Sequence, residues 1–347
     1  MGILFLQFFL ISDKLSLLIF ISFHCFNAFL NTFFKILYAS DRPFMQFDEL
    51  QVFSCEISLG KPSGHAQSSI FFYIFLMEFV NSRLDLKKMK FLRPFINILT
   101  FGIIFLIGLS RIFKGVHSFS QVLLGWGYGQ FSLFFWLFAR KRLYDLLKKR
   151  SNGTIRAIGR ESGNLILYMI MTIFLTILSF NLRSEHTDFP DYELNNLEKK
   201  CGVKLTTRQL FEKTLLSTAY ILVVFGLVQG FIVTRGSLKP ELYRNGISQF
   251  TWWKVLLRFV ILAISLLVIL GVPYGINTDP EVNIYLILFL KNYLPYFIVG
   301  LFLIYLLPKI YWKCGVDVEG DLMRVEKKVV DEVMESNKLE MCEETKK

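Results

Sequence analysis

The sequence is poor in charged residues and in cysteine, and each shortage excludes a class of protein. Only 19% of its 347 residues are charged, whereas 53% are hydrophobic and the mean hydropathy is +0.46. This composition is too apolar for an ordinary soluble domain. Five cysteines are too few for a disulfide-based scaffold. The sequence also lacks an internal repeat and a second region with the composition of a soluble domain.

Long apolar runs, to which 37 phenylalanines contribute, indicate a polytopic membrane protein. About 20 apolar residues cross the hydrocarbon core as a helix, which satisfies its own backbone hydrogen bonds there. Residues 2–12 are apolar but would reach only ~16 Å as a helix, so they are the end of a ninth span or an interfacial anchor. We predict an all-α transmembrane bundle whose eight full spans lie near residues 15–38, 65–82, 95–113, 117–139, 163–182, 214–234, 255–273 and 284–308.

Charge alternates along the connections between these spans. The basic connections are 83–93, 140–160 and 235–258. The connections richer in acids are 39–64, 183–213 and 274–283. By the positive-inside rule the basic set is cytosolic, and the acidic set lies on the lumenal or extracellular face. Anionic lipid headgroups account for the basic clusters, so they do not call for a nucleic-acid partner.

Three polar islands interrupt the apolar sequence of the first 140 residues. Each lies at the edge of an apolar run, where a charge is expensive unless it has a function or a partner. Counting crossings places all three on the non-cytosolic face. Together they supply cations and histidines that can hold a tetrahedral oxyanion and exchange one of its oxygens. The islands are Lys35 with Arg42-Pro43, Pro62-Ser63-Gly64-His65, and Ser110-Arg111 with His117 and Gln121.

Local sequence signals place the first two islands at helix ends. Pro43 restricts Arg42 to an extended conformation, so the helix that carries Lys35 is predicted to stop before Arg42. Ser63 can cap a helix that begins after it. Gly64 would then let the backbone approach an anion at the helix N-terminus.

The third island combines a turn with a helix start. Gly115 allows a tight turn, and a helix beginning at His117 would put Gln121 on the same face one turn later. Each group also has a purely structural alternative. Arg42 and Arg111 can be rim residues that snorkel to the membrane surface, and a lone histidine is more often part of a core. The combination of groups favours a catalytic site.

The order and internal spacing of these islands resemble the three-part signature of the type 2 phosphatidic acid phosphatase (PAP2) superfamily. The matching patterns are Lys35-x6-Arg42-Pro43, Pro62-Ser63-Gly64-His65 and Ser110-Arg111-x5-His117. One departure is Gln121, because most members have Asp at this position. Glucose-6-phosphatase is similar to the chain there and in the Cys55-Glu56 pair, whereas Gly115-Val116-His117-Ser118 resembles sphingosine-phosphate phosphatases.

The resemblance implies a phosphoric monoester hydrolase that needs no metal or cofactor and works through a phosphohistidine. In that mechanism His117 attacks phosphorus, His65 protonates the leaving oxygen and Gln121 orients the His117 ring. No cluster in the sequence has the spacing of metal ligands. The residues expected to bind phosphate are Lys35, Arg42, Ser63, Gly64 and Arg111.

The substrate class is predicted from the position of the site. Because the islands lie at the rim of the bilayer, where a lipid presents its headgroup, we expect a lipid phosphate of the phosphatidic acid or sphingoid-base phosphate type. A sugar phosphatase similar to glucose-6-phosphatase is an alternative, favoured by Gln121 and the number of spans. A lipid phosphotransferase is another. The expected location is the endoplasmic reticulum or another endomembrane, with a lumenal site, or the plasma membrane with an extracellular one.

These patterns divide the chain into four parts. A PAP2-type core occupies residues 1–140, a basic cytosolic loop 141–162, further transmembrane spans 163–312 and a cytosolic tail 313–347.

The sequence suggests two side-chain pairings, a disulfide and an ion pair, without deciding either. Cys55 and Cys201 fall in loops on the same predicted side, where they could be bonded, but two free thiols are the expectation. Glu78 lies within a span and is expected to pair with a cation of another span, for which Lys291 is a candidate.

The predicted orientation can be checked at Asn152. The sequon Asn152-Gly153-Thr154 lies in the basic 140–160 loop, so it should stay unmodified in a cell that glycosylates secretory proteins. We expect no change in electrophoretic mobility on endoglycosidase treatment. A glycosidase-sensitive shift that Asn152→Gln abolishes would contradict the orientation.

Overall fold

The computed structural model describes residues 14–83, 91–149, 155–233, 252–275 and 283–314, and these residues form helices and connecting loops without a strand. The predicted all-α bundle is therefore confirmed. Residues 2–12, Asn152 and most of the predicted tail lie outside the described residues. The helices are α2 (Lys14–Tyr38), α3 (Pro43–Gln46), α4 (Gly64–Arg83), α5 (Leu92–Phe113), α6 (Phe119–Lys149), α7 (Ile155–His186), α8 (Asp191–Cys201), α9 (Thr207–Leu216), α10 (Tyr220–Val233), α11 (Trp252–Gly275), α12 (Ile284–Ile287), α13 (Leu294–Leu301) and α14 (Leu307–Lys313).

Several helical segments are long and apolar enough to cross a membrane, which supports a multi-pass membrane protein. Within the described residues there are six: Ile19–Gln46, Leu92–Phe113, Phe119–Arg142, Gly159–His186, Thr207–Val233 and Ile284–Leu306. The other two predicted spans, 65–82 and 255–273, are also helical and form α4 and α11. In α11 the apolar stretch is the shorter Leu256–Gly271.

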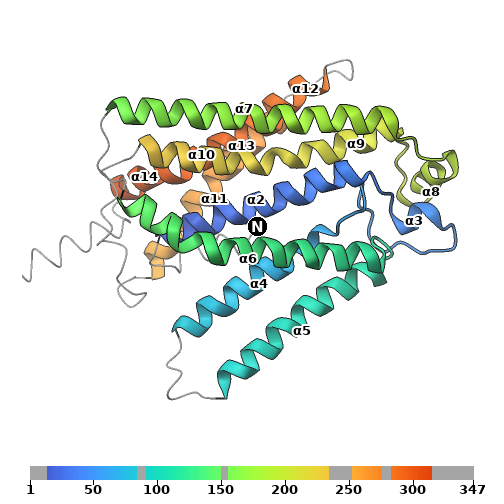
Figure 1. Cartoon of the computed structure of the whole chain (residues 1–347), viewed down its shortest axis with the longest axis horizontal. Coiled ribbons are helices and arrows are strands. Elements are labelled where there is room, and N and C mark those ends of the chain that lie inside the picture. The colour runs from blue at the N-terminus through green and yellow to red at the C-terminus, as the bar shows by residue number, and fades with distance from the viewer. Residues whose placement is uncertain (1–13, 84–90, 150–154, 234–251, 276–282, 315–347) are drawn as a thin grey trace, which may run out of the picture.

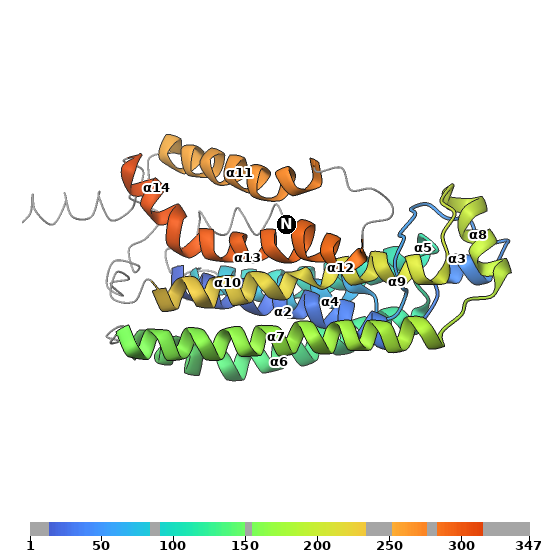
Figure 2. The same ribbon diagram turned by 90° about the horizontal axis from the view of Figure 1, so that it is seen from above.

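The bundle is built around α2, which packs against α4, α6, α7 and α10. Its two halves meet along α2 and α10, and α10 in turn packs against α13. Seen from above, α10 lies between α13 and α7, with α11 outside α13 (Figure 2). The short helices α3 and α8 lie together at one end of the bundle (Figure 1), where the chain leaves α2.

Buried polar side chains join α2 to α4. Asn31 Nδ2 donates to Gln67 Oε1 at 2.8 Å, and Gln67 Nε2 donates to Asn27 Oδ1 at 2.9 Å. All three side chains are buried. Such interhelical hydrogen bonds satisfy polar groups where water is absent and fix the register of the two helices.

Glu78 pairs with a neighbour in the same half of the chain. Its Oε1 lies 2.5 Å from Arg140 Nη1, across the contact between α4 and α6. The proposed pairing with Lys291 is therefore wrong, because α4 packs against α6 rather than against the helices that follow residue 283. Lys291 lies in the π-helical turn Leu288–Tyr293, just before the helix that contains Pro295. This span therefore continues as a helix past Pro295, with a π-helical turn before it.

Two glycines allow α10 and α13 to touch along their backbones. A Cβ atom at Gly226 would lie 2.1 Å from the carbonyl oxygen of Phe297, and one at Gly300 would lie 2.3 Å from that of Val223. Small residues at such crossings permit close packing between apolar helices. The second half of the chain is held together by this contact.

We expect Gly226→Ala to destabilise the protein by about 1–3 kcal/mol, because the added methyl group must push the two backbones apart. Gly271→Ala is the matched control, since a Cβ atom there meets nothing within 4 Å, and alanine is the better helix former. Thermal unfolding in detergent measures the difference. Equal unfolding temperatures for the two variants would contradict the close crossing.

Candidate active site

The three polar islands meet at the end of the bundle where α3 and α8 lie (Figure 1). Lys35 lies in the last turn of α2 and Arg111 in the last turn of α5. Arg42 follows the end of α2 at Tyr38 and has the extended conformation that Pro43 predicted, with φ −107° and ψ 151°. The predicted convergence of distant segments is present in the structure.

Arg42 is the buried centre of this end of the bundle. Its side chain is 1% exposed, and its Nε donates to the carbonyl oxygen of Ser58 at 2.6 Å. Nη2 donates to Ser58 Oγ at 2.9 Å, and Nη1 donates to the carbonyl oxygen of Val116, also at 2.9 Å. Lys35 Nζ donates to the same Ser58 Oγ at 3.3 Å. These bonds fix the guanidinium plane between the loop before α4 and the turn before α6.

His117 lies in the turn before α6, not at the start of that helix as predicted, because α6 begins at Phe119. Gln121 nevertheless contacts its ring. Gln121 Nε2 donates to the carbonyl oxygen of Asp41 at 2.8 Å, so its Oε1 faces His117 Nδ1 at 3.1 Å. Nδ1 therefore carries the ring proton, and the lone pair of Nε2 points toward Arg42 Nη1, 3.3 Å away.

The surroundings of His117 keep its ring neutral. Burial, followed by the positive charges of Arg42 and Lys35, lowers the pKa of His117 to about 2, although the hydrogen bond to Gln121 acts in the opposite direction. A neutral ring leaves Nε2 unprotonated and able to act as a nucleophile.

The second island contributes an exposed histidine and a buried serine. The side chain of His65 is 61% exposed, at the start of α4. Ser63 does not cap α4 through its side chain: its Oγ is buried and has no hydrogen-bond partner among the described residues, so the predicted cap is wrong. Its backbone binds instead, since its N–H donates to Gln121 O and its carbonyl accepts from Gln67 N. Gly64 lies close to α2, since a Cβ atom there would be 2.9 Å from Asn31 Oδ1 and would displace that side chain.

One carboxylate, that of Glu56, links the members of the site. Its Oε1 accepts a hydrogen bond from Arg111 Nη2 and lies 3.9 Å from His65 Nδ1. Its Oε2 lies 3.1 Å from Arg42 Nη1 and 3.7 Å from His117 Nε2. Two guanidinium groups and two imidazoles thus surround a space that one small anion can fill. Sequence analysis did not place Glu56 in the site, although an acid between two cationic islands was a signal for it.

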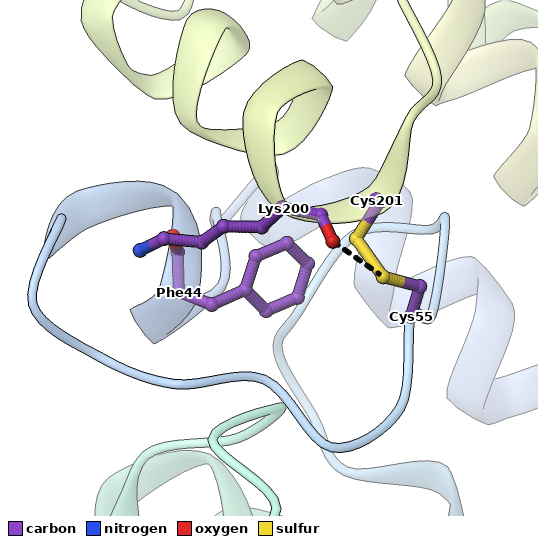
Figure 3. The surroundings of a disulfide bond; sticks show 4 residues. All are labelled: Phe44, Cys55, Lys200 and Cys201. Carbon is purple, nitrogen blue, oxygen red and sulfur yellow. Dashed lines mark hydrogen bonds between the residues drawn. A yellow bond between two sulfur atoms is a disulfide. The ribbon is translucent and has the colours of Figure 1, made fainter.

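The second half of the chain holds the loop that carries Glu56. Cys55 is bonded to Cys201, the last residue of α8, so the expectation of two free thiols is wrong (Figure 3). Next to this bond, Lys200 Nζ donates to the carbonyl oxygen of Phe44 at 3.0 Å. On the other side of Glu56, the N–H of Leu59 donates to Thr214 Oγ1 at 3.0 Å. The site is therefore assembled from both halves of the chain.

Glu193 adds a titratable contact between α8 and the first island. Burial and the nearby carboxylate of Asp41 raise the pKa of Glu193 to about 7. Near neutral pH Glu193 can therefore hold a proton, which it can donate in a hydrogen bond to the side chain of Asp41. Since the backbone carbonyl of Asp41 also accepts the bond from Gln121, α8 supports the residue that orients His117.

Comparison with known proteins agrees with this arrangement. Residues 16–145 match the family model of the PAP2 superfamily. This range runs from α2 into α6 and contains every residue predicted for the site. None of the curated proteins and none of the solved structures compared with the chain matches it. The superfamily resemblance is thus confirmed, whereas the features shared with glucose-6-phosphatase and sphingosine-phosphate phosphatases stay predictions.

The lowered pKa of His117 predicts how stability depends on pH. Below pH ~6.5 the unfolded chain takes up a proton at His117 that the folded protein does not. The free energy of unfolding therefore keeps its full contribution from this residue above that pH. It decreases as the pH falls further, by up to about 1.4 kcal/mol per pH unit. We expect His117→Asn to flatten the pH dependence of the unfolding free energy between about pH 6 and pH 5 by that amount.

The matched control for this measurement is His186→Asn, because His186 is exposed at the end of α7. The free energy of unfolding is measured in detergent at several pH values for both variants and for the wild type. An unchanged slope in His117→Asn would contradict a neutral, buried His117.

Proposed function

We propose that the protein, whose residues 16–145 match the family model of the PAP2 superfamily, is an integral-membrane phosphatase that hydrolyses phosphomonoesters through a phosphohistidine and needs no metal. The observation that best supports this proposal is the contact of Arg42, Arg111, His65 and His117 with a single carboxylate. A phosphoryl group needs the same combination of positive charge, a nucleophile and an acid within one small space.

In this proposal the phosphate oxygens bind where Glu56 lies. Arg42 and Arg111 neutralise two of them, and charge-assisted hydrogen bonds from guanidinium groups are strong and directional. Lys35, next to Ser58, adds positive charge from behind Arg42. The buried Ser63 Oγ supplies a further donor, and the Gly64 N–H at the start of α4 is another.

The reaction then has two steps. Nε2 of His117 attacks phosphorus, the bond to the leaving oxygen breaks, and His65 gives its proton to that oxygen. In the second step His65 takes a proton from a water molecule, whose oxygen attacks phosphorus while the phosphorus–nitrogen bond breaks. Inorganic phosphate leaves, and the lone pair returns to Nε2. The exposure of His65 suits a group that must meet both the leaving alcohol and water.

We propose a lipid phosphate as the substrate, because apolar side chains border the site. Phe53, in the same loop as Glu56, stacks on Phe113 with ring centroids 5.9 Å apart, and both are exposed. Phe119 is exposed at the start of α6. Exposed aromatic groups next to a charged pocket suit a ligand with a polar head and apolar chains. A sugar phosphate is the second candidate, which Gln121 and the Cys55-Glu56 pair favour. A lipid phosphotransferase would pass the phosphoryl group from His117 to an alcohol.

The proposed location is an endomembrane such as the endoplasmic reticulum, with the site on the lumenal side. The bond between Cys55 and Cys201 supports an oxidising compartment at this end of the bundle. The charge of the connecting loops supports the same orientation.

His117→Ala should reduce phosphate release at least about 10³-fold, because it removes the nucleophile. His186→Ala, at an exposed site, should retain wild-type activity. Membranes carrying each form are assayed with phosphatidic acid, a sphingoid-base phosphate and glucose 6-phosphate, and the products are analysed for transfer to alcohols. Equal hydrolysis by wild type and His117→Ala would contradict the assignment of the nucleophile, and hydrolysis of glucose 6-phosphate alone would contradict the lipid substrate.

A further inference from the structure

Glu56 makes the contacts that a substrate phosphate needs. Its two oxygens engage Arg42 and Arg111 and lie within 3.9 Å of both histidines. A phosphoryl group bound by the same guanidinium N–H groups would overlap with this carboxylate. Substrate and Glu56 therefore exclude each other from the site, and one must leave before the other binds.

The chain on both sides of Glu56 is anchored, but its side chain has room to move. Cys55 is fixed by its bond to Cys201, and Ser58 is held by Arg42 and Lys35. The side chain of Glu56 is 24% exposed, so it has a path toward solvent. A group tethered this closely has a high effective concentration at the site, which a short link provides without additional contacts.

We propose that Glu56 is an affinity-setting residue of the phosphate site: it competes from within the chain for the position of the phosphate, and the Cys55–Cys201 bond keeps it there. This inference rests on the proposed function for its physiological meaning. A phosphomonoester brings up to two negative charges against the single charge of the carboxylate and displaces it. The apparent dissociation constant rises by the reciprocal of the fraction of molecules whose site is open.

Two consequences follow for binding. The binding of inorganic phosphate, the product of the proposed reaction, is weakened by the same factor as the binding of the substrate, so product release is favoured. Cleavage of the disulfide frees the loop, lowers the effective concentration of the carboxylate and strengthens anion binding. The affinity of the site thus depends on the redox state of a bond that joins the two halves of the chain.

The test measures the binding of inorganic phosphate to the purified full-length protein in detergent by isothermal titration calorimetry. We expect Glu56→Gln, which keeps the shape of the side chain but removes its charge, to bind phosphate at least about 10-fold more tightly than the wild type. Glu49→Gln is the matched control, because Glu49 is an exposed acid in the same loop, and it should bind like the wild type. Unchanged or weaker binding by Glu56→Gln would overturn the proposal.

A second measurement needs no substitution at Glu56. The wild type treated with dithiothreitol should bind phosphate several-fold more tightly than the oxidised protein. The double variant Cys55→Ser/Cys201→Ser should bind tightly without reductant and should not respond to it, which separates this bond from Cys25 and Cys314. If Glu56→Gln does not fold, equal binding by oxidised and reduced wild type overturns the proposal. Because phosphate binding is measured without turnover, a protein that hydrolyses no phosphomonoester can still show the Glu56 effect, and the two proposals fail separately.

Discussion

Buried positive charge is the constraint on which this end of the molecule depends. Lys35, Arg42 and Arg111 are all buried and come from three different places in the chain: the last turn of α2, the extended residue before α3 and the last turn of α5. Burying a cation is costly unless hydrogen bonds and a counter-charge compensate for the lost water. Backbone carbonyls and the Ser58 hydroxyl accept the hydrogen bonds, and Glu56 provides the counter-charge. The loop before α4 therefore has to fold over the three cations, and a phosphate entering from solvent takes over a role that a carboxylate already fills.

The second half of the chain has a place in this arrangement, although it carries none of the three islands. The α8 and α9 helices hold the loop and the first island through the disulfide, through Lys200 and through Thr214. The α10 helix, which follows α9 in the chain, crosses α13 closely at Gly226 and Gly300. Spans that lack a recognisable motif thus hold the loop that carries Glu56 in position.

Sequence analysis predicted the helical class and the convergence of the islands, because span length and helix-end signals such as Pro43 act locally. It did not predict which side chains would meet across the bundle. Glu56 lies between two cationic islands, but Glu49 in the same loop shares that position, so the sequence did not show which of the two acids would enter the site. The Cys55–Cys201 bond depends on how α8 packs against α3, and the partner of Glu78 depends on which helix α4 faces. Such pairings follow from tertiary packing, which spacing along the chain does not encode.

Gln121 shows how a departure from the usual motif is accommodated. An aspartate at this position could accept a hydrogen bond from the N–H at His117 Nδ1, and its charge would raise the basicity of the ring. It could not donate a hydrogen bond to the carbonyl of Asp41, as Gln121 Nε2 does at 2.8 Å. The glutamine therefore lacks a charge next to His117, the proposed nucleophile, but gains a direct hydrogen bond to the segment that carries Arg42. The site therefore contains one carboxylate, that of Glu56, which lies among the cations. The ring of His117 has the neutral Gln121 as its hydrogen-bond partner at Nδ1. A less basic imidazole is also a better leaving group from phosphorus, which favours the second step of the proposed reaction.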